Sequence, residues 1–310
     1  MNALLLLLLW AWLMASSFIV SGHMVQYASP LATSAVRFLL SLLMMLPALM
    51  VSWHRSGLNI LDQFRALFQS KRRLLHYLMI SGALVGFFVG LFTSLELTTP
   101  LHTSVLYTLI PLMGVLIAFV WLRELPSWWR VLGFVLGSMG AMIVLLATHS
   151  SGTFGWNKGD SLFLGACLLL AFHVVSVQKW GRTLGALPGA FMIMLFGSVW
   201  LLPIALIWGN IEQVQWLSFG FWSTILYLTI FTTLLTFVLQ QRLVTTVGAS
   251  RLLAFSYTVP IWVAVYTAFS QARWSDLFDF GFVTGVSIVL LALILIRDNR
   301  GVGVIVAKQV

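Results

Sequence analysis

The chain has 310 residues, of which 60% are hydrophobic and only 8% are charged, and its formal net charge is +9 at pH 7. Soluble domains carry roughly a quarter charged residues, so this composition excludes a water-soluble globule. It also excludes a nucleic-acid-binding protein. Such a protein gathers its lysines and arginines on one face of a soluble domain, and the sequence has no soluble segment of useful size.

Ten apolar segments are long enough to cross the hydrocarbon core of a bilayer, which takes about 20 residues. They lie at residues 3–23, 31–52, 74–96, 101–122, 129–147, 160–179, 188–207, 219–239, 249–270 and 278–296. The first has no positively charged leading region, and its apolar run is too long for a signal peptide, so we treat it as a span. Residues 53–73 form the longest loop, where apolar side chains at helical spacing predict a helix on the membrane surface.

The 17 lysines and arginines predict the orientation of the chain. Two lie in loops after odd-numbered spans (Lys158, Arg273) and two lie within spans (Arg37, Arg251). All the others follow even-numbered spans or lie in the C-terminal tail: Arg55, Arg65, Lys71, Arg72, Arg73, Arg123, Arg130, Lys179, Arg182, Arg242, Arg297, Arg300 and Lys308. This asymmetry predicts a multi-pass protein of the cell inner membrane with both termini in the cytoplasm.

The two halves of the chain carry matching features. Pro111 in the fourth span corresponds to Pro260 in the ninth, and the starts and ends of these spans align at the same spacing of 149 residues. Each half holds five spans, an odd number, so the second half must enter the membrane from the opposite side.

We therefore predict an all-α integral membrane protein whose ten transmembrane helices form two inverted five-helix repeats. The first repeat comprises residues 1–147 and the second residues 160–297. Residues 148–159 are expected to be a periplasmic linker, and residues 298–310 a cytoplasmic tail. Inverted repeats around a site at the membrane midplane are typical of secondary transporters.

The matched prolines indicate where a binding site would lie. A proline within a helix removes a backbone hydrogen bond, and the freed carbonyl is tolerated where it lines a water-filled cavity or is met by neighbours. A packing kink is the ordinary alternative, but matched positions in two halves favour a site. Helical spacing and aromatic rings with polar tips then predict the substrate-contacting residues: Trp12, Thr103, Tyr107, Pro111, His173, Tyr227, Ser256, Tyr257, Pro260 and Trp262.

Ionisable residues inside spans are few and are therefore functional candidates. Arg37 and Glu96 lie at similar depth, so we expect them to pair, either as a structural ion pair or as a substrate handle. His173, near the middle of the sixth span, could bind substrate or relay a proton, although a lone histidine is more often neutral and hydrogen-bonded to a carbonyl. We assign coupling or gating to Arg37, Glu96 and His173.

Other residues are expected to serve packing. Gly133 and Gly137, and again Gly281 and Gly285, are spaced so that helix backbones can approach closely. The single Cys167 lies in an apolar run and excludes an intramolecular disulfide, so we expect it to be a small buried residue. We expect neither a metal site nor a cofactor.

The sequence also resembles a known family. The Ala35–Leu39 stretch resembles the A-x-R-F signature of the drug/metabolite transporter superfamily, EamA type, as does the fourth-span pattern from Tyr107 to Glu124. This resemblance implies ten helices in two inverted repeats, a central cavity lined mainly by helices one, three, four, six, eight and nine, and export of amino acids or related metabolites, sometimes of drugs. Many relatives carry Glu before the proline, where this chain has Ile110 and Val259, which removes the easiest carboxylate for proton coupling.

We therefore predict an exporter of small amphipathic metabolites such as amino acids, working by alternating access around a midplane cavity. The main alternative is efflux of drugs or toxic cations by the same fold. We expect no enzyme, because the chain lacks HExxH, GxSxG and paired intramembrane aspartates. A non-transporting scaffold would not need matched prolines. The partners are then a small-molecule substrate and the lipid bilayer, with no nucleic acid, and the sequence is compatible with a monomer. Movement of solute down its own gradient is favoured over proton coupling.

Overall fold

The computed structural model describes residues 3–148, 156–181 and 184–297, and these are folded almost entirely into helices. Uninterrupted helices form six of the spans: α1 (Ala3–Met24), α2 (Pro30–Arg55), α4 (Lys71–Leu95), α7 (Trp128–Thr148), α8 (Lys158–Trp180) and α9 (Ala186–Trp208). Most of the predicted linker (residues 149–155) and the predicted tail (residues 298–310) lie outside the described residues.

Three further spans are interrupted helices. The first contains α5 (Pro100–Tyr107), α6 (Ile110–Ile117) and the π-helical η1 (Ala118–Leu122). The second contains α10 (Phe219–Thr229), the π-helical η4 (Ile230–Leu235) and α11 (Thr236–Val247). The third contains α12 (Ala249–Ala254), the 3₁₀-helical η5 (Phe255–Thr258) and α13 (Val259–Ser270).

The spans match the sequence prediction closely. Nine helices within the described residues are long and apolar enough to cross a membrane, and the helix at the tenth predicted position, α14 (Phe280–Arg297), has a shorter apolar stretch. Short 3₁₀ turns, η3 (Ile211–Gln213) and η6 (Trp274–Phe278), lie in loops. The chain is therefore a multi-pass membrane protein.

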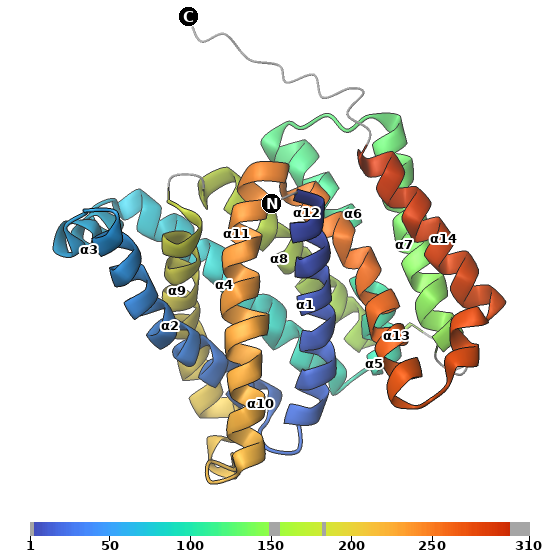
Figure 1. Ribbon diagram of the computed structural model, residues 1–310, viewed down its shortest axis with the longest axis horizontal. Coiled ribbons are helices and arrows are strands. Elements are labelled where there is room, and N and C mark those ends of the chain that lie inside the picture. Colours follow the sequence, from blue (N-terminus) through green and yellow to red (C-terminus); the bar gives the residue numbers. More distant parts are fainter. Residues whose placement is uncertain (1–2, 149–155, 182–183, 298–310) are drawn as a thin grey trace, which may run out of the picture.

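The start of α1 and the end of α14 lie at the same end of the bundle (Figure 1). We call this the terminal end, and the other the opposite end. The predicted surface helix is present as α3 (Ile60–Phe68), at the edge of the bundle. Its Phe64 ring packs edge-on against Trp53 and Phe191, whereas Leu61 is exposed, as expected for an amphipathic helix on a membrane surface.

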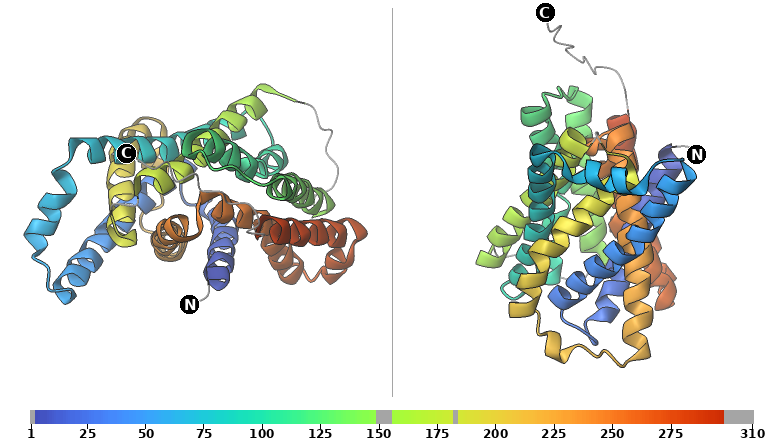
Figure 2. Two further views of the ribbon diagram at one scale, coloured as in Figure 1. Left: turned by 90° about the horizontal axis from the view of Figure 1, so that it is seen from above. Right: turned by 90° about the vertical axis from the view of Figure 1, so that its left-hand side faces the viewer.

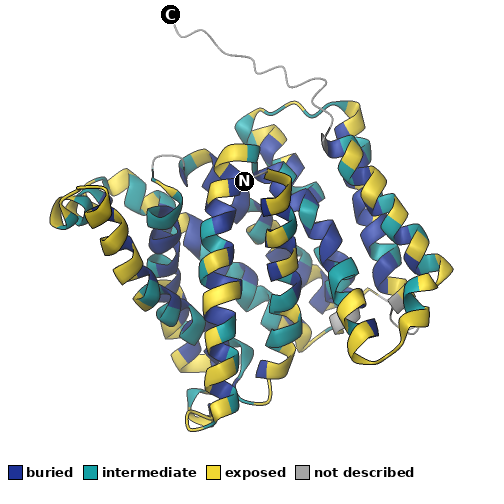
Figure 3. Cartoon of the chain, in the orientation of Figure 1, coloured by how far each residue is buried: buried dark blue, intermediate teal, exposed yellow. Residues whose placement is uncertain are grey.

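The buried side chains face the middle of the bundle and the exposed ones face outward (Figure 3). Much of the outward surface is apolar; Val120, Leu206 and Phe269, for example, are largely exposed. Exposed apolar surface of this extent would promote aggregation in water but is suited to contact with lipid chains. The largest core cluster joins α1, α2, α4, α8, α9 and α11.

Helices α7 and α14 pack together at one edge of the molecule, far from α2 and α3 (Figure 2). A Cβ atom added at Gly140 would lie 3.0 Å from the Gly285 carbonyl oxygen, and one at Gly133 would lie 3.0 Å from that of Ala292. The two helices therefore run antiparallel with their backbones in close approach. Gly137 packs against the ring of Tyr257 instead, so the predicted glycine spacing is only partly used between these two helices.

We predict that Gly140→Val destabilises the fold, because its side chain would overlap α14. Overpacking of this kind costs about 1–3 kcal/mol. Cys167, the single cysteine, is buried, so a thiol-reactive dye reports unfolding directly as the protein is heated in detergent. Gly165→Val is the control, since a Cβ there meets nothing within 4 Å. Equal unfolding temperatures for the two variants would contradict the close contact.

Candidate functional site

The two helices that carry the matched prolines are broken at equivalent positions. Leu109, just before α6, has φ −82° and ψ −13°, and Thr258, just before α13, has φ −81° and ψ −14°. These residues are 149 positions apart, the spacing predicted from the sequence. Pro111 and Pro260 each occupy the first turn of the helix that follows the break, where a missing N–H costs no helical hydrogen bond. The matched prolines therefore start new helices rather than kink continuous ones.

Helix α7 supplies hydrogen bonds to both breaks. The Ser138 hydroxyl donates to the Thr108 carbonyl oxygen (3.0 Å), which lies at the first break. Tyr257, in the second break, donates its hydroxyl to the Phe134 carbonyl oxygen (2.9 Å), and its oxygen lies 3.0 Å from Ser138 Oγ. Only two hydroxyl protons serve these three contacts. The sequence prediction placed Tyr257 beside the substrate, whereas its hydroxyl points to α7; it did not identify Ser138.

An aromatic cluster lies beside the first break. Tyr107 is half-buried and packs against Phe18 of α1 (5.6 Å between ring centroids) and Phe87 of α4 (6.3 Å). The indole nitrogen of Trp262, in α13, is buried without a hydrogen-bond partner among the described residues. Two of the predicted substrate-contacting residues thus present aromatic surface close to the breaks, and one of them retains a free donor.

Arg37 of α2 reaches the π-helical segment of the eighth span. Its Nε donates to Thr233 Oγ1 and its Nη2 to Thr232 Oγ1, both at 3.0 Å. The expected pair with Glu96 is wrong: Glu96 caps the exposed end of α4, and within the described residues no ion pair involves Arg37. The π turn places two consecutive threonines toward Arg37, which the sequence prediction could not see because it assumed regular α-helical spacing.

His173 is fully buried between three spans. Its Nδ1 lies 2.9 Å from the Ile80 carbonyl oxygen, and its Nε2 lies 3.3 Å from Gln240 Nε2. A carbonyl can only accept, so Nδ1 carries the proton and Nε2 accepts from the Gln240 amide, which describes a neutral imidazole. These contacts favour the structural interpretation of His173 over proton relay.

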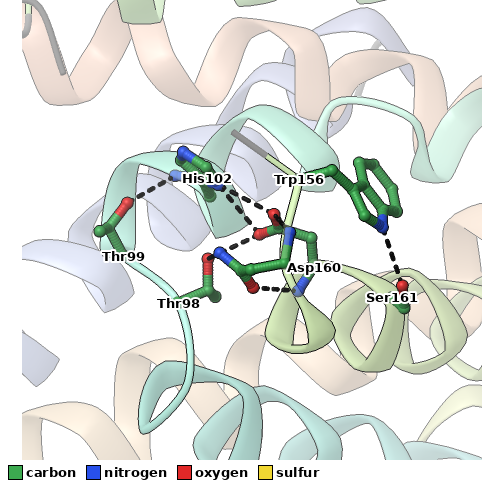
Figure 4. A network of polar contacts seen from close by, with 7 residues as sticks. Thr98, Thr99, His102, Trp156, Asp160 and Ser161 are labelled. Atoms are coloured by element: carbon green, nitrogen blue, oxygen red, sulfur yellow. Dashed lines mark hydrogen bonds and ion pairs between the residues drawn. The ribbon is translucent and has the colours of Figure 1, made fainter. Parts of the chain in front are cut away.

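A buried polar network lies at the opposite end of the bundle, and Figure 4 shows its contacts from close by. His102 Nδ1 lies 3.0 Å from both carboxylate oxygens of Asp160, which also accept from the Thr98 hydroxyl (2.6 Å) and the Asn157 backbone N–H (2.9 Å). Asp160 is only 2% exposed. The network joins the α4–α5 turn and the start of α5 to the start of α8, and therefore ties the two halves of the chain together. Asp160 was not among the predicted site residues.

The terminal end also joins the two halves, because Gln178 donates to Glu124 Oε1 (2.5 Å) and accepts from the Ala249 backbone N–H (2.6 Å). Beside these contacts lies a cavity. Its volume is about 560 Å³, and it lies between the starts of α1 and α12 and the ends of α11 and α14. The lining is apolar apart from Arg251, with Leu7, Phe255 and Leu293 among its residues. Arg251 stands 149 positions after His102, so the cavity occupies the place in the second half that the buried network occupies in the first.

Of the remaining predicted residues, Ser256 lies in the second break and Thr103 lies in α5 beside His102, whereas Trp12 and Tyr227 lie apart from the breaks. Trp12 is 48% exposed on α1. Tyr227 is half-buried beside Phe231. Thr103 and Ser256 are buried, and the Ser256 hydroxyl donates to the Leu253 carbonyl of its own helix. Cys167 is buried, as predicted.

We predict that Asp160→Asn weakens the opposite-end network, because an amide cannot accept all the hydrogen bonds that the carboxylate accepts. A buried donor left unsatisfied costs about 1–3 kcal/mol, so the temperature at which Cys167 becomes reactive should fall. Asp62→Asn is the matched control, since Asp62 is exposed and lies 4.0 Å from Arg65. An unchanged unfolding temperature in Asp160→Asn would show that the network adds nothing to stability.

A family model and curated relatives agree that this chain is similar to transporters. The model of the EamA-like transporter family matches twice, over residues 1–146 and 157–297. The chain is similar to two Bacillus subtilis (strain 168) proteins. It is 22% identical to the uncharacterized transporter YyaM over 95% of this chain and 93% of that one, and 25% identical to the uncharacterized transporter YetK over 90% and 81%. A solved structure described as "Crystal structure of protein" shares the fold with a TM-score of 0.76 at 15% identity, over 95% of this chain and 96% of that one.

Proposed function

Because the chain belongs to the EamA-like transporter family and so to the drug/metabolite transporter superfamily, we propose that it is a secondary transporter that exports small amphipathic metabolites across the cell inner membrane. The observation that carries this proposal is the pair of helix breaks with the same backbone angles at equivalent positions of the two halves. Matched interruptions of two repeats are the best indication of a transporter's binding site.

The proposal includes inverted repeats related by a two-fold axis in the membrane plane. Helices α7 and α14 hold the fifth position in each half and run antiparallel at their contact. The second helices of the halves, α2 and α9, are also antiparallel neighbours. Ser29 at the start of α2 bonds to the Gly209 carbonyl at the end of α9, and Gly197 packs on Phe38 further along. Antiparallel pairing of equivalent helices supports inversion of the second half.

A difference between the ends of the bundle supports alternating access in this proposal. Asp160 and His102 join the start of α8 to the start of α5 at the opposite end, whereas the starts of α1 and α12 at the terminal end border a cavity. With the positive-inside orientation, this conformation opens toward the cytoplasm and is closed toward the periplasm. An exporter would load its solute in this conformation.

The charge distribution favours metabolites over toxic cations. The described carboxylates in or next to spans are Glu96, Glu124, Asp160 and Asp279, and all lie near helix ends. A lipophilic cation at mid-depth would lack a counter-charge from them. With Glu96 exposed and His173 held neutral, we keep the proposal that solute moves down its own gradient or by exchange. Concentrative transport driven by an imposed pH gradient would contradict the proposal that solute moves without proton coupling.

The test is counterflow of labelled amino acids and related amphipathic metabolites in proteoliposomes, with a reversible lock on the opposite end. A Cβ at Gly159 would lie 2.9 Å from that of Leu97, so the two atoms must move apart by about 0.6 Å to reach the roughly 3.5–4.5 Å of a disulfide. We expect the Leu97→Cys, Gly159→Cys pair, in a Cys167→Ala background, to transport when reduced and to stop when oxidised.

Leu97→Cys alone should transport under both conditions, and Gly159→Cys alone shows how much transport is lost to crowding of the α4–α5 turn, a loss that oxidation should not change. Counterflow that continues in the fully cross-linked protein would contradict opening at this end. If the reduced double variant and the wild type both fail to exchange every solute, the transport proposal itself is wrong.

A further inference from the structure

We propose that Arg37, oriented by Thr232 and Thr233, binds a carboxylate group of the transported solute. The inference rests on the proposed transport function and deepens it, because it names the chemical class of the solute. It concerns an arginine within a span whose hydrogen bonds, among the described residues, go to two threonines and not to a carboxylate.

The Arg37 guanidinium lies deep within a membrane span. Arg37 lies seven residues into α2, about 10 Å from the start of that helix at 1.5 Å per residue. Thr232 and Thr233 lie near the middle of the long span Phe219–Val247. A guanidinium at this depth is costly unless it is paired or hydrated, by at least about 2.5 kcal/mol on the mildest scale. The fold therefore keeps a charge where neutral side chains would be more stable.

Thr232 and Thr233 are themselves held by hydrogen bonds to their own helix. Both hydroxyls donate to the same carbonyl oxygen, that of Leu228, at 2.8 Å from Thr232 and 3.0 Å from Thr233. Thr232 and Thr233 are four and five positions after Leu228, and the π turn brings both of them to its carbonyl oxygen. With their protons used, both hydroxyls present only lone pairs to Arg37. They act as fixed acceptors that set the plane of the guanidinium and leave its charge unneutralised.

One nitrogen of the Arg37 guanidinium, Nη1, has no hydrogen-bond partner among the described residues. Arginine has five N–H donors, and the described residues use one on Nε and one on Nη2. Nη1 has no partner among the described residues, yet it is not among the polar atoms sealed inside the fold without one. It therefore reaches accessible space. Lipid at this depth would not tolerate the charge, so the proposed site requires that this space is hydrated.

The geometry that remains suits a carboxylate. The Nη1 and Nη2 hydrogens form the outer edge of a planar fork, which matches two carboxylate oxygens in a bidentate pair. A phosphate ester would call for several cations, and Arg37 is alone. The neighbouring Phe38 is buried, and its ring packs against Phe88 and Phe237. Phe88 and Phe237 are half-buried and supply apolar surface near the charge. An amphipathic carboxylic acid, including a zwitterionic amino acid, fits both features.

The experiment compares acids with their amides on the full-length protein in detergent. The probes are L-tryptophan, L-phenylalanine and L-leucine, each beside its carboxamide, and the readout is the dissociation constant from the shift of the unfolding temperature. We expect at least one acid to bind the wild type at least tenfold more tightly than its amide. Arg37→Gln should abolish that preference, Arg37→Lys should reduce it, and Thr232→Val should weaken it.

Matched controls test for general damage. Arg65 is exposed, and the Thr93 hydroxyl bonds only to its own helix on an exposed face, so Arg65→Gln and Thr93→Val should bind as the wild type does. If Arg37→Gln does not fold, the acid and amide comparison on the wild type and on Thr232→Val still decides. Failure of every acid to bind, equal binding of acids and amides, or unchanged binding in Arg37→Gln would overturn the carboxylate site.

The two proposals fail in different ways. Counterflow of amines or amides with no dependence on a carboxylate would remove the carboxylate site and leave the transporter. Absence of counterflow for every solute would remove the transport function, whatever the binding measurements give.

Discussion

A backbone group inside a bilayer must find a hydrogen-bond partner within the protein, because the hydrocarbon offers none. The two spans with matched breaks meet this constraint with hydroxyl groups. Ser138 of α7 donates to the Thr108 carbonyl at the first break, and at the second break Ser256 and Thr258 donate to the carbonyls of Leu253 and Phe255. Tyr257 also ties the second break to α7 by donating to the Phe134 carbonyl.

The breaks of the two halves meet at one side chain of α7. The Ser138 Oγ lies 3.0 Å from both the Thr108 carbonyl oxygen and the Tyr257 hydroxyl oxygen. Polar contacts join the halves at both ends of the bundle, and the terminal end has a cavity beside its own. Two repeats that exchange these arrangements would open the two ends in turn.

The spans and the matched breaks could be predicted from the sequence, because hydropathy and proline spacing act over short distances. The contacts of Arg37 could not. The expected partner was the nearest carboxylate at similar depth, Glu96, whereas a π turn brings Thr232 and Thr233 to face Arg37. Nothing in the composition of the eighth span signals that turn. Tyr257 was assigned to the substrate because its helix face can be predicted, but the rotation of that face toward α7 depends on tertiary packing.

Asp160 was missed for a different reason. An aspartate at the predicted edge of a span is expected to be solvated, yet the structure buries it beneath the α4–α5 turn. A local signal existed: Asn157 and Asp160 form a reciprocal capping box at the start of α8, which fixes the carboxylate at a defined position. That signal identifies the helix start but not the histidine that meets it, since His102 comes from the other half of the chain.

The central claim is that the two ends open in turn, and pulsed electron paramagnetic resonance distances test it most directly. Spin labels at Thr99 and Lys158 would report the opposite end, and labels at Ala3 and Thr246 the terminal end; all four positions are exposed. The account predicts that a solute identified by counterflow changes the two distances in opposite directions, lengthening the first as it shortens the second. Distances that stay constant, or that lengthen together, would contradict it.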